Sequence, residues 1–267
     1  MSAPAELAGG RLRVDFPAEH VARLTIDNQA KRNALDRELL DALAATVAGL
    51  HARCLLLTGA GPMFSAGYDI GDLPAGEPLA AAEQAVADPF EEALAALDAF
   101  PFPSVAALNG HAIGGGLELA LACDLRIAAS SAKLGMPPGR LGLIYSHGGV
   151  RRFLDAIGAP RTRELFFVAR NVDAATALAW GLVNQAVDAA ALPAAAVELA
   201  AAIAANAPLS LRGNKRVIGE LLAASGPLDP AVERELRALR DACFASDDFR
   251  EGVRAFAEKR PPRWQDR

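Results

Sequence analysis

The sequence has few cysteines and no apolar run long enough to cross a membrane. Cys54, Cys123 and Cys243 are its three cysteines, and they match no metal-ligand spacing. Their odd number indicates a reducing compartment and buried thiols. The most apolar long segment, residues 186–209, is interrupted by two acidic residues and a proline. We interpret it as an amphipathic helix and expect no contact with a membrane.

An excess of positive charge is also missing. The 267 residues include 27 Lys and Arg against 32 Asp and Glu, which gives a formal net charge of −5. An acidic chain with scattered basic residues is a poor candidate for nucleic-acid binding. The first ten residues contain no basic region followed by an apolar core, so we expect no signal peptide and a cytoplasmic protein. The hydrophobic fraction of 52% is typical of a globular chain with a sizeable core.

Two nucleotide-binding motifs are absent as well. Gly59 and Gly61 follow an apolar run, as in a dinucleotide-binding fingerprint, but Phe64 stands where the third glycine should be. Pro62 would also prevent the close approach of the backbone to a phosphate. The Gly-Lys-Ser/Thr of a P-loop is missing too. What remains is a buried strand followed by a second glycine turn at Gly67.

The stretch that the sequence does contain is glycine-rich and spans residues 109–120. The apolar run 104–108 before it predicts a buried strand, and residues 114–116 are three glycines at the start of a predicted helix. Glycines here let the backbone approach a ligand and present N–H groups that the helix cannot satisfy. Together with the helix dipole, those groups suit an oxygen that gains negative charge during a reaction.

Glu118 stands three residues after Gly115, on the same face of the predicted helix. Because its side chain leans toward the helix N-terminus, its carboxylate is aimed at the place where such an oxygen would lie. The turn at residues 66–68 follows another buried strand and can supply a second N–H group. The two turns together predict an oxyanion hole. A tight packing turn with a solvated Glu118 is the alternative.

The remaining patterns indicate a body of strands and helices followed by a helical region. The expected elements are a hairpin over 11–16 and 21–26, a helix from Asp36 to about residue 50, a loop and marginal helix over 71–88, a helix over 88–100 and a strand over 123–129. From Val150 onward the patterns are almost wholly helical. We therefore divide the chain into a core of residues 1–207 and a C-terminal helical region of residues 208–267.

Five segments together resemble the enoyl-CoA hydratase/isomerase (crotonase) superfamily, in order and at the spacing of that family. They are residues 31–36 (KRNALD), 64–70 (FSAGYDI), 109–118 (NGHAIGGGLE), 123–124 (CD) and 256–260 (FAEKR). The resemblance implies an α/β fold, a crotonase-like spiral of β-β-α units with a helical C-terminal trimerisation region. It also implies a homotrimer or hexamer. The substrate would be a coenzyme A thioester, with no separate cofactor and no metal.

The resemblance assigns site residues one by one. The two oxyanion-hole donors fall on the backbone N–H groups of Tyr68 and Gly115, and Glu118 takes the position of one catalytic glutamate. The positions that contact the substrate and its coenzyme A fall on Lys31, Arg32, Ala34, Ala66, Asp69, Ile70, Phe256 and Lys259. The last two of these often serve a neighbouring subunit. Solvated charges for the basic residues and core packing for Phe256 are the alternatives.

One departure from the family pattern bears on the chemistry. Hydratases of the family use a second glutamate in a Gly-x-Pro-Glu segment, and here Pro138 takes its place. Proline cannot exchange a proton, so half of the machinery for adding water is missing. The segments 64–74, 136–145 and 246–252 are similar to the methylmalonyl-CoA decarboxylase-like branch. In that branch the tyrosine matching Tyr145 lies in the active site.

The main prediction is therefore a decarboxylase-like lyase, in which the two N–H groups stabilise a thioester enolate. Tyr145 would hold the departing carboxylate or protonate the enolate, unless it is a core aromatic residue. Two alternatives stay open: an enoyl-CoA hydratase or isomerase that relies on Glu118 alone, and a catalytically weak acyl-CoA-binding protein. His111 and His147 are near enough in the sequence to reach a pocket, but we expect both to be structural.

Overall fold

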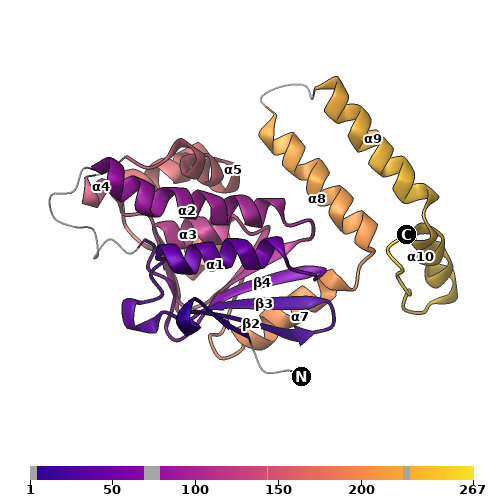
Figure 1. The fold of residues 1–267 in the computed structure, drawn as a ribbon, viewed down its shortest axis with the longest axis horizontal. Helices are drawn as coiled ribbons and strands as arrows, with labels where there is room; N and C mark the ends of the chain where they lie inside the picture. The colour runs from indigo at the N-terminus through magenta and orange to yellow at the C-terminus, as the bar shows by residue number, and fades with distance from the viewer. Residues whose placement is uncertain (1–4, 69–78, 143, 225–228) are drawn as a thin grey trace.

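The computed structural model describes residues 5–68, 79–142, 144–224 and 229–267. It consists of a body of two sheets with covering helices, and an arm of three helices that leads away from the body (Figure 1). The arm consists of α8 (Pro208–Ala223), α9 (Pro230–Ala245) and α10 (Asp247–Glu258). Its first helix starts at the residue where the sequence was divided into two regions.

The buried apolar runs form the larger sheet. Among the described residues it has seven strands in the order β1-β2-β3-β4-β6-β8-β11. Neighbouring strands are antiparallel from β1 to β3 and parallel from β3 to β11. Parallel strands are covered on both faces, which explains why β4 and β6 are apolar along their length. The strands are β1 Ala5–Leu7, β2 Leu12–Ala18, β3 Val21–Ile26, β4 Cys54–Gly59, β6 Ser104–Leu108, β8 Leu125–Ala129 and β11 Gln185–Val187.

The smaller sheet reveals a repeated unit. In the described parts of the chain its order is β10-β9-β7-β5, with β5 Met63–Ser65, β7 His111–Ile113, β9 Lys133–Gly135 and β10 Val172–Asp173. β5, β7 and β9 each follow a strand of the larger sheet after a short turn, and a helix comes next in each case. The first strands of these units are neighbours in one sheet and the second strands are neighbours in the other. This confirms the predicted α/β spiral of β-β-α units.

Helices cover both sides of the larger sheet. Figure 1 shows α1, α2 and α3 on one side and α7 on the other, and α7 packs against β4 and β6. The predicted cap of α1 is confirmed, since the Asp36 carboxylate accepts a hydrogen bond from the Leu39 N–H at 3.0 Å. The helices of the body are α1 Arg37–Ala48, α2 Leu79–Ala99, α3 Gly115–Leu121, α4 Pro138–Leu141, α5 His147–Arg163, α6 Ala174–Trp180 and α7 Leu192–Ala204, with short turns η1 Ala8–Gly10, η2 Gln29–Lys31 and η3 Glu164–Val168.

Several predicted boundaries are wrong. α2 starts at Leu79 instead of Asp88 and contains Pro89, because the buried side chains that follow, such as Phe90, hold the helix despite the missing N–H. Residues 71–78 of the predicted loop lie outside the described residues. The segment 186–209 is not one helix: it includes the end of β11, all of α7 and the start of α8. The short strands were missed, because two or three residues become strands only through pairing with their neighbours; they are β1, β5, β7, β9, β10 and β11.

The cysteines are largely buried, as expected. Cys54 and Cys123 are fully buried, whereas Cys243 in the arm is only partly so. Burial raises the pKa of the Cys54 and Cys123 thiols to about 12. Both thiols therefore stay protonated and unreactive at neutral pH. No group of three or more His, Cys, Asp or Glu side chains that could hold a metal occurs among the described residues.

The arm exposes apolar side chains. Ile218 and Leu222 of α8 are 58% and 52% exposed, and Phe256 of α10 is 88% exposed. Within the described ranges no single helix is long and apolar enough to cross a membrane, and the pair α7 and α8 that passes by length and composition is bent by 100°. Burying such side chains is favourable by about 25 cal/mol per Å². A second copy of the chain is the partner that the resemblance implies.

We therefore expect the chain to be a trimer or hexamer by light scattering at micromolar concentration. Replacing Ile218 and Leu222 together by Asp should reduce the measured mass toward that of one chain, because two charges would be buried at the contact. Phe16→Asp changes an equally exposed apolar side chain of β2 and serves as the control. A wild-type chain that runs as a monomer would contradict the predicted assembly.

Candidate active site

The glycine turn between β7 and α3 presents backbone N–H groups. Gly114 has φ +56° and ψ −126°, a conformation that favours glycine, and its N–H donates to the Gly135 carbonyl at 2.9 Å. Gly116 has no room for a side chain, because an added Cβ would lie 2.5 Å from the Ser65 carbonyl oxygen. Gly115 is the first residue of α3, and the first N–H groups of a helix have no partner within it. A ligand oxygen can use the Gly115 N–H.

The turn after β5 is held directly against this glycine turn. The Ser65 hydroxyl donates to the Asn33 carbonyl at 2.8 Å and accepts from the Gly67 N–H at 3.1 Å. Gly67 has φ +90°, and an added Cβ at this residue would lie 3.1 Å from the Gly115 nitrogen. Tyr68 follows immediately. The two turns therefore meet, as the prediction of two neighbouring N–H donors requires.

A carboxyl group and two phenols lie beside the turns. The Glu118 side chain on α3 is buried, with 2% of the residue exposed, so the alternative of a solvated glutamate is wrong. The Tyr145 hydroxyl donates a hydrogen bond to Glu118 Oε2. The Tyr68 phenol lies near this pair, since the two tyrosines and Glu118 influence one another's pKa. An added Cβ at Gly115 would lie 3.2 Å from the Tyr68 ring. The four predicted catalytic residues are thus brought together.

Burial governs the protonation of this cluster. It raises the pKa of the Glu118 carboxyl, while the Tyr145 hydrogen bond and the charge of Arg152 act in the opposite direction. Burial also raises the pKa of Tyr68 and of Tyr145, so both phenols stay protonated at neutral pH. A carboxyl whose pKa is raised exchanges a proton more readily near neutral pH, as general acid–base catalysis requires.

The start of α5 touches the same cluster. The Ser146 hydroxyl caps this helix by accepting from the Gly149 N–H at 3.0 Å. An added Cβ at Gly149 would lie 2.5 Å from Tyr145 Cε1 and 2.8 Å from Glu118 Oε1. At the preceding Gly148 the same added atom would have nothing within 4 Å. Gly149 therefore has no room for a side chain, whereas Gly148 has.

We expect Gly149→Ala to lower turnover roughly 10²-fold, because the methyl group would displace Tyr145 and Glu118 from their hydrogen bond by a distance on the order of 1 Å. Gly148→Ala is the matched control and should retain the wild-type rate. Steady-state kinetics measure the effect, and near-ultraviolet circular dichroism checks the fold. Equal rates for the two variants would mean that the close contact at Gly149 has no part in catalysis.

The position of the missing second glutamate is occupied by a buried proline. Pro138 is the first residue of α4. In the described parts of the chain, the hydrogen bond to the Glu118 carboxyl comes from Tyr145 and none comes from a second carboxyl. Glu91 of α2 is the carboxylate whose charge raises the pKa of Glu118, and it lines the same cleft. Glu118 is thus the carboxyl that Tyr145 contacts directly.

The predicted coenzyme A contacts lie in two separate places. Lys31 and Arg32 are exposed, and the Arg32 carbonyl accepts from the Ala66 N–H at 3.1 Å, which ties the basic loop to the turn after β5. Phe256 and Lys259 lie at the end of α10 in the arm. The exposure of Phe256 excludes core packing within its own chain. One chain alone does not bring the two groups together.

The remaining candidate residues differ in burial and position. Ala34 is buried in the basic loop. Asp69 and Ile70 lie outside the described residues. His111 is structural, as expected, because its Nδ1 accepts a backbone N–H at the start of β9 at 3.1 Å. His147 is exposed at the start of α5 and lines the cleft described next.

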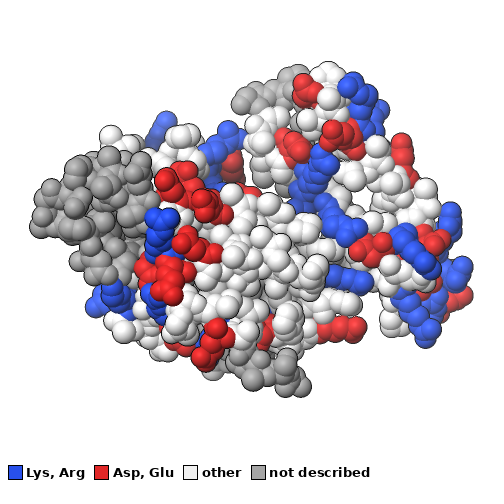
Figure 2. Space-filling view, in the orientation of Figure 1, with Lys and Arg blue, Asp and Glu red and all other residues white. Residues whose placement is uncertain are grey.

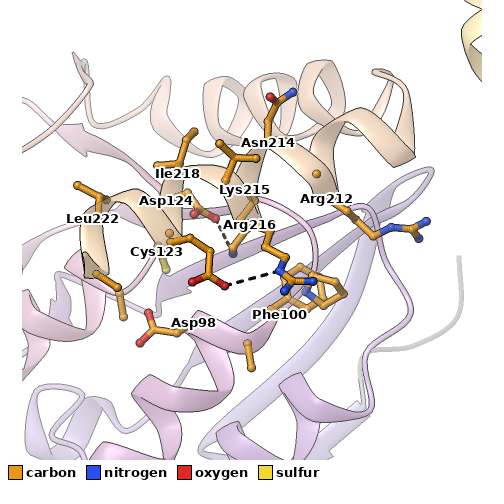
Figure 3. A pocket seen from close by; sticks show the side chains of 18 of the residues that line it. Asp98, Phe100, Cys123, Asp124, Arg212, Asn214, Lys215, Arg216, Ile218 and Leu222 are labelled. Atoms are coloured by element: carbon orange, nitrogen blue, oxygen red, sulfur yellow. Dashed lines mark hydrogen bonds and ion pairs between the residues drawn. The ribbon is translucent and has the colours of Figure 1, made fainter. Parts of the chain in front are cut away.

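A cleft of about 2330 Å³ lies between the body and the arm. Residues of α2, α3, α5, α8 and α9 line it, including Glu118 and Gly149. Lys215 of α8 reaches across to the body, where its Nζ lies 2.8 Å from Asp124 Oδ2 and 3.0 Å from the Phe102 carbonyl oxygen (Figure 3). Figure 2 shows basic side chains alternating with acidic ones along the border between body and arm. The cleft has mixed charge, and Glu118 forms part of its wall.

Sequence analysis missed three residues of the site. Asn33 is fully buried, and its amide donates to the Ala60 carbonyl at 2.9 Å and the Met63 carbonyl at 2.7 Å, so it fastens the basic loop to the turn after β5. Gly149 and Arg152 belong to α5. Two adjacent glycines before a helix were the available signal for Gly149. Arg152 carried no local signal, because its importance comes from a neighbour on another helix.

The spiral fold, the two adjoining turns and the buried carboxyl are the features that the resemblance to the crotonase superfamily predicts. The family model "Enoyl-CoA hydratase/isomerase" matches residues 17–267. A putative enoyl-CoA hydratase/isomerase, YngF of Bacillus subtilis, is 38% identical over 250 residues, covering 91% of this chain and 93% of its own. The short-chain-enoyl-CoA hydratase of Clostridium acetobutylicum is 32% identical, with 90% and 92% covered.

Solved structures agree with this assignment. The enoyl-CoA hydratase of Bacillus anthracis has a TM-score of 0.88 and 32% identity, covering 96% of this chain and 100% of its own. DspI of Pseudomonas aeruginosa has a TM-score of 0.86 and 37% identity, with 96% and 97% covered. The chain belongs to the enoyl-CoA hydratase/isomerase family, whose enzymes act on coenzyme A thioesters. Of these relatives, the proteins of B. subtilis, C. acetobutylicum and B. anthracis have hydratase or hydratase/isomerase names, which agrees with the hydratase or isomerase alternative better than with the main prediction of a lyase.

Proposed function

We propose that the chain is an enoyl-CoA isomerase that moves a double bond from the 3 to the 2 position of an acyl thioester. The observation that carries the proposal is the buried Glu118 carboxyl, which accepts a hydrogen bond from Tyr145 beside the Gly115 turn, with Pro138 where a second acid would stand. Isomerisation needs one group that takes a proton and returns it. The family assignment and the names of the relatives support an enoyl-CoA substrate.

The proposed steps use groups that lie together in the site. The thioester carbonyl oxygen accepts from the N–H groups of Tyr68 and Gly115. The Glu118 carboxylate removes a proton from C2, and the negative charge of the resulting dienolate is concentrated on the thioester oxygen, where the two donors stabilise it. The protonated Glu118 then returns the proton to C4, which completes the 2-enoyl product. Tyr145 holds the carboxyl in place throughout.

Hydration requires two proton-transfer tasks at the same time, whereas isomerisation requires one group that takes and returns a proton. Water must be activated as it attacks C3, while a proton is delivered to C2, and two carboxyl groups usually share these tasks. General acid–base groups contribute roughly 10²–10⁴-fold each. With Pro138 in the second position, hydration of crotonyl-CoA should be slower than in a two-glutamate enzyme by a factor of that order.

Decarboxylation is the second candidate, favoured by Tyr145 at the site and by the sequence similarity to the decarboxylase-like branch. A substrate with a carboxylate on its α-carbon would bring a second negative charge close to Glu118. Like charges in a buried site oppose each other, so this substrate requires a protonated Glu118. Decarboxylation should therefore accelerate as the pH falls, whereas isomerisation requires the carboxylate and should accelerate as the pH rises.

The test is to assay 3-hexenoyl-CoA, crotonyl-CoA and methylmalonyl-CoA on one preparation between pH 5 and 9. The proposal predicts that isomerisation is the fastest reaction and that its rate rises with pH. Decarboxylation as the fastest reaction, with a rate that falls with pH, would overturn the proposal in favour of the lyase. Rapid hydration would favour a hydratase. Binding of all three thioesters without turnover would favour an acyl-CoA-binding protein.

A further inference from the structure

Arg152 joins two helices beside the buried carboxyl. It lies on α5 three residues after Gly149, on the same face of the helix as the glycine whose Cβ position is 2.8 Å from Glu118 Oε1. Its guanidinium forms a bidentate ion pair with Asp98 of α2, with Nη1 to Oδ1 at 3.0 Å and Nη2 to Oδ2 at 2.5 Å. Figure 3 shows Asp98 on the wall of the cleft that Glu118 and Arg152 also line. Two parallel hydrogen bonds hold an arginine in one orientation.

The adjacent arginine behaves differently. Arg151 pairs with Asp155 one turn along its own helix, with Nε to Oδ1 at 2.8 Å, and its Nη2 donates to the Leu222 carbonyl of α8 at 2.7 Å. It also lines the cleft, but its guanidinium is directed along α5 and toward α8 and not toward α2. The chain thus offers two neighbouring arginines of the same helix, of which Arg152 pairs with α2 and Arg151 contacts α8.

The charged and titratable groups that influence Glu118 come from each of the elements around it. Tyr145 lies before α5, and Tyr68, linked to Tyr145, lies in the turn after β5. Glu91 of α2 opposes ionisation of Glu118, and Arg152 of α5 favours it. Among the described residues Arg152 is the cation of this set. A buried carboxylate is costly unless a positive charge or hydrogen bonds compensate it.

We infer that Arg152 is a positioning residue: anchored by Asp98 on the wall of the same cleft, it holds a positive charge near Glu118 that favours the carboxylate, the form that can accept a proton. The inference rests on the proposed function, in which the Glu118 carboxylate is the base. Burial raises the pKa of Glu118, and Arg152 counteracts part of that rise. Asp98 orients the guanidinium. Burial lowers the pKa of Arg152, but the ion pair with Asp98 and the charge of Glu118 outweigh it and raise that pKa, so the side chain stays charged.

One experiment measures the ionisation of Glu118 without any turnover. The midpoint of thermal unfolding is recorded from pH 5 to 9 at fixed protein concentration, for chains with Glu118 and with Glu118→Gln. The pKa of Glu118 is higher in the folded chain than in the unfolded chain. The contribution of Glu118 to the free energy of unfolding is therefore fully present below the pKa of the unfolded state. It is lost as the pH rises through the pKa of the folded state. In an Arg152→Gln background this loss should continue to higher pH. In an Arg151→Gln background it should not change.

A second readout is the pH profile of kcat/KM for 3-hexenoyl-CoA. Arg152→Gln should move the acidic limb to higher pH, so that its loss of rate is about tenfold greater at pH 6 than at pH 9. KM should change little, since Arg152 does not contact the thioester. Arg152→Lys keeps a positive charge but cannot form the two parallel hydrogen bonds of the guanidinium. It should restore part of the rate at pH 6. If Arg152→Gln does not fold, Arg152→Lys carries the test, with a smaller shift in the same direction.

The two readouts separate the inference from the proposed function. Shifts in Arg152→Gln, and none in Arg151→Gln, support the inference. An unchanged unfolding difference, or an unchanged pH profile in an active enzyme, overturns it while the isomerase assignment stands. A shift in the unfolding difference with no isomerase turnover in the wild-type chain supports the effect of Arg152 on Glu118 and overturns the proposed function.

Discussion

Glu118→Gln is expected to lower isomerase turnover by roughly 10²–10⁴-fold, the usual contribution of a general acid–base group. Glutamine has nearly the same shape and still accepts the Tyr145 hydrogen bond, but it cannot take up a proton. The binding of the thioester should be largely retained, because the donors at Tyr68 and Gly115 are unchanged. Steady-state kinetics with 3-hexenoyl-CoA measure kcat, and equilibrium binding of the same thioester measures affinity.

The same substitution makes a prediction about stability. Since the pKa of Glu118 is raised in the folded chain, the carboxylate lowers stability at neutral and higher pH. Glu118→Gln should therefore raise the midpoint of thermal unfolding at pH 8 and lose this advantage toward pH 4. Glu91→Gln is the control, because Glu91 is an exposed residue of the same cleft. An active Glu118→Gln enzyme would exclude Glu118 as the proton-transfer group.

Gly115→Pro is expected to lower turnover by about 10²–10³-fold, because it removes one of the two N–H donors proposed for the thioester oxygen. Gly115 is the first residue of α3, a position at which proline is tolerated, so the helix should persist. The effect should fall mainly on kcat, since negative charge develops on the oxygen during the reaction. Steady-state rates with 3-hexenoyl-CoA measure the change in kcat, and the far-ultraviolet circular dichroism spectrum measures whether the helix persists.

Gly115→Ala is the matched variant, because alanine keeps the N–H. Its Cβ would lie 3.2 Å from the Tyr68 ring, so a small adjustment of that ring is needed. We expect a loss well below that of Gly115→Pro. Equal losses in the two variants would show that space beside Tyr68, and not the donor, is what matters at Gly115. A folded Gly115→Pro enzyme with unchanged turnover would remove the proposed oxyanion hole.

The longer strands of the larger sheet and the glycine turns could be predicted from the sequence because their signals are local. The run at β4 is apolar at nearly every position, as a strand covered on both faces must be. Gly114 has a positive φ, which restricts the position largely to glycine. Glu118 could be placed on the inner face of α3 from helical spacing alone. The boundaries of α2 could not, since the burial of Phe90 and its neighbours outweighs the local effect of Pro89.

By itself, the sequence determined the α/β spiral, the family, the oxyanion-hole turns and the missing second glutamate at Pro138. Each depends on residue type and spacing within one segment, or on several segments in a fixed order. Only the tertiary structure decided that Tyr145 donates to Glu118 and that Gly149 lies against both side chains. These contacts join α3 to residues about 30 positions away, and local propensities contain no information about which side chains meet across packed helices. The ionisation of Glu118 follows from those contacts, because burial and neighbouring charges exist only once the chain has folded.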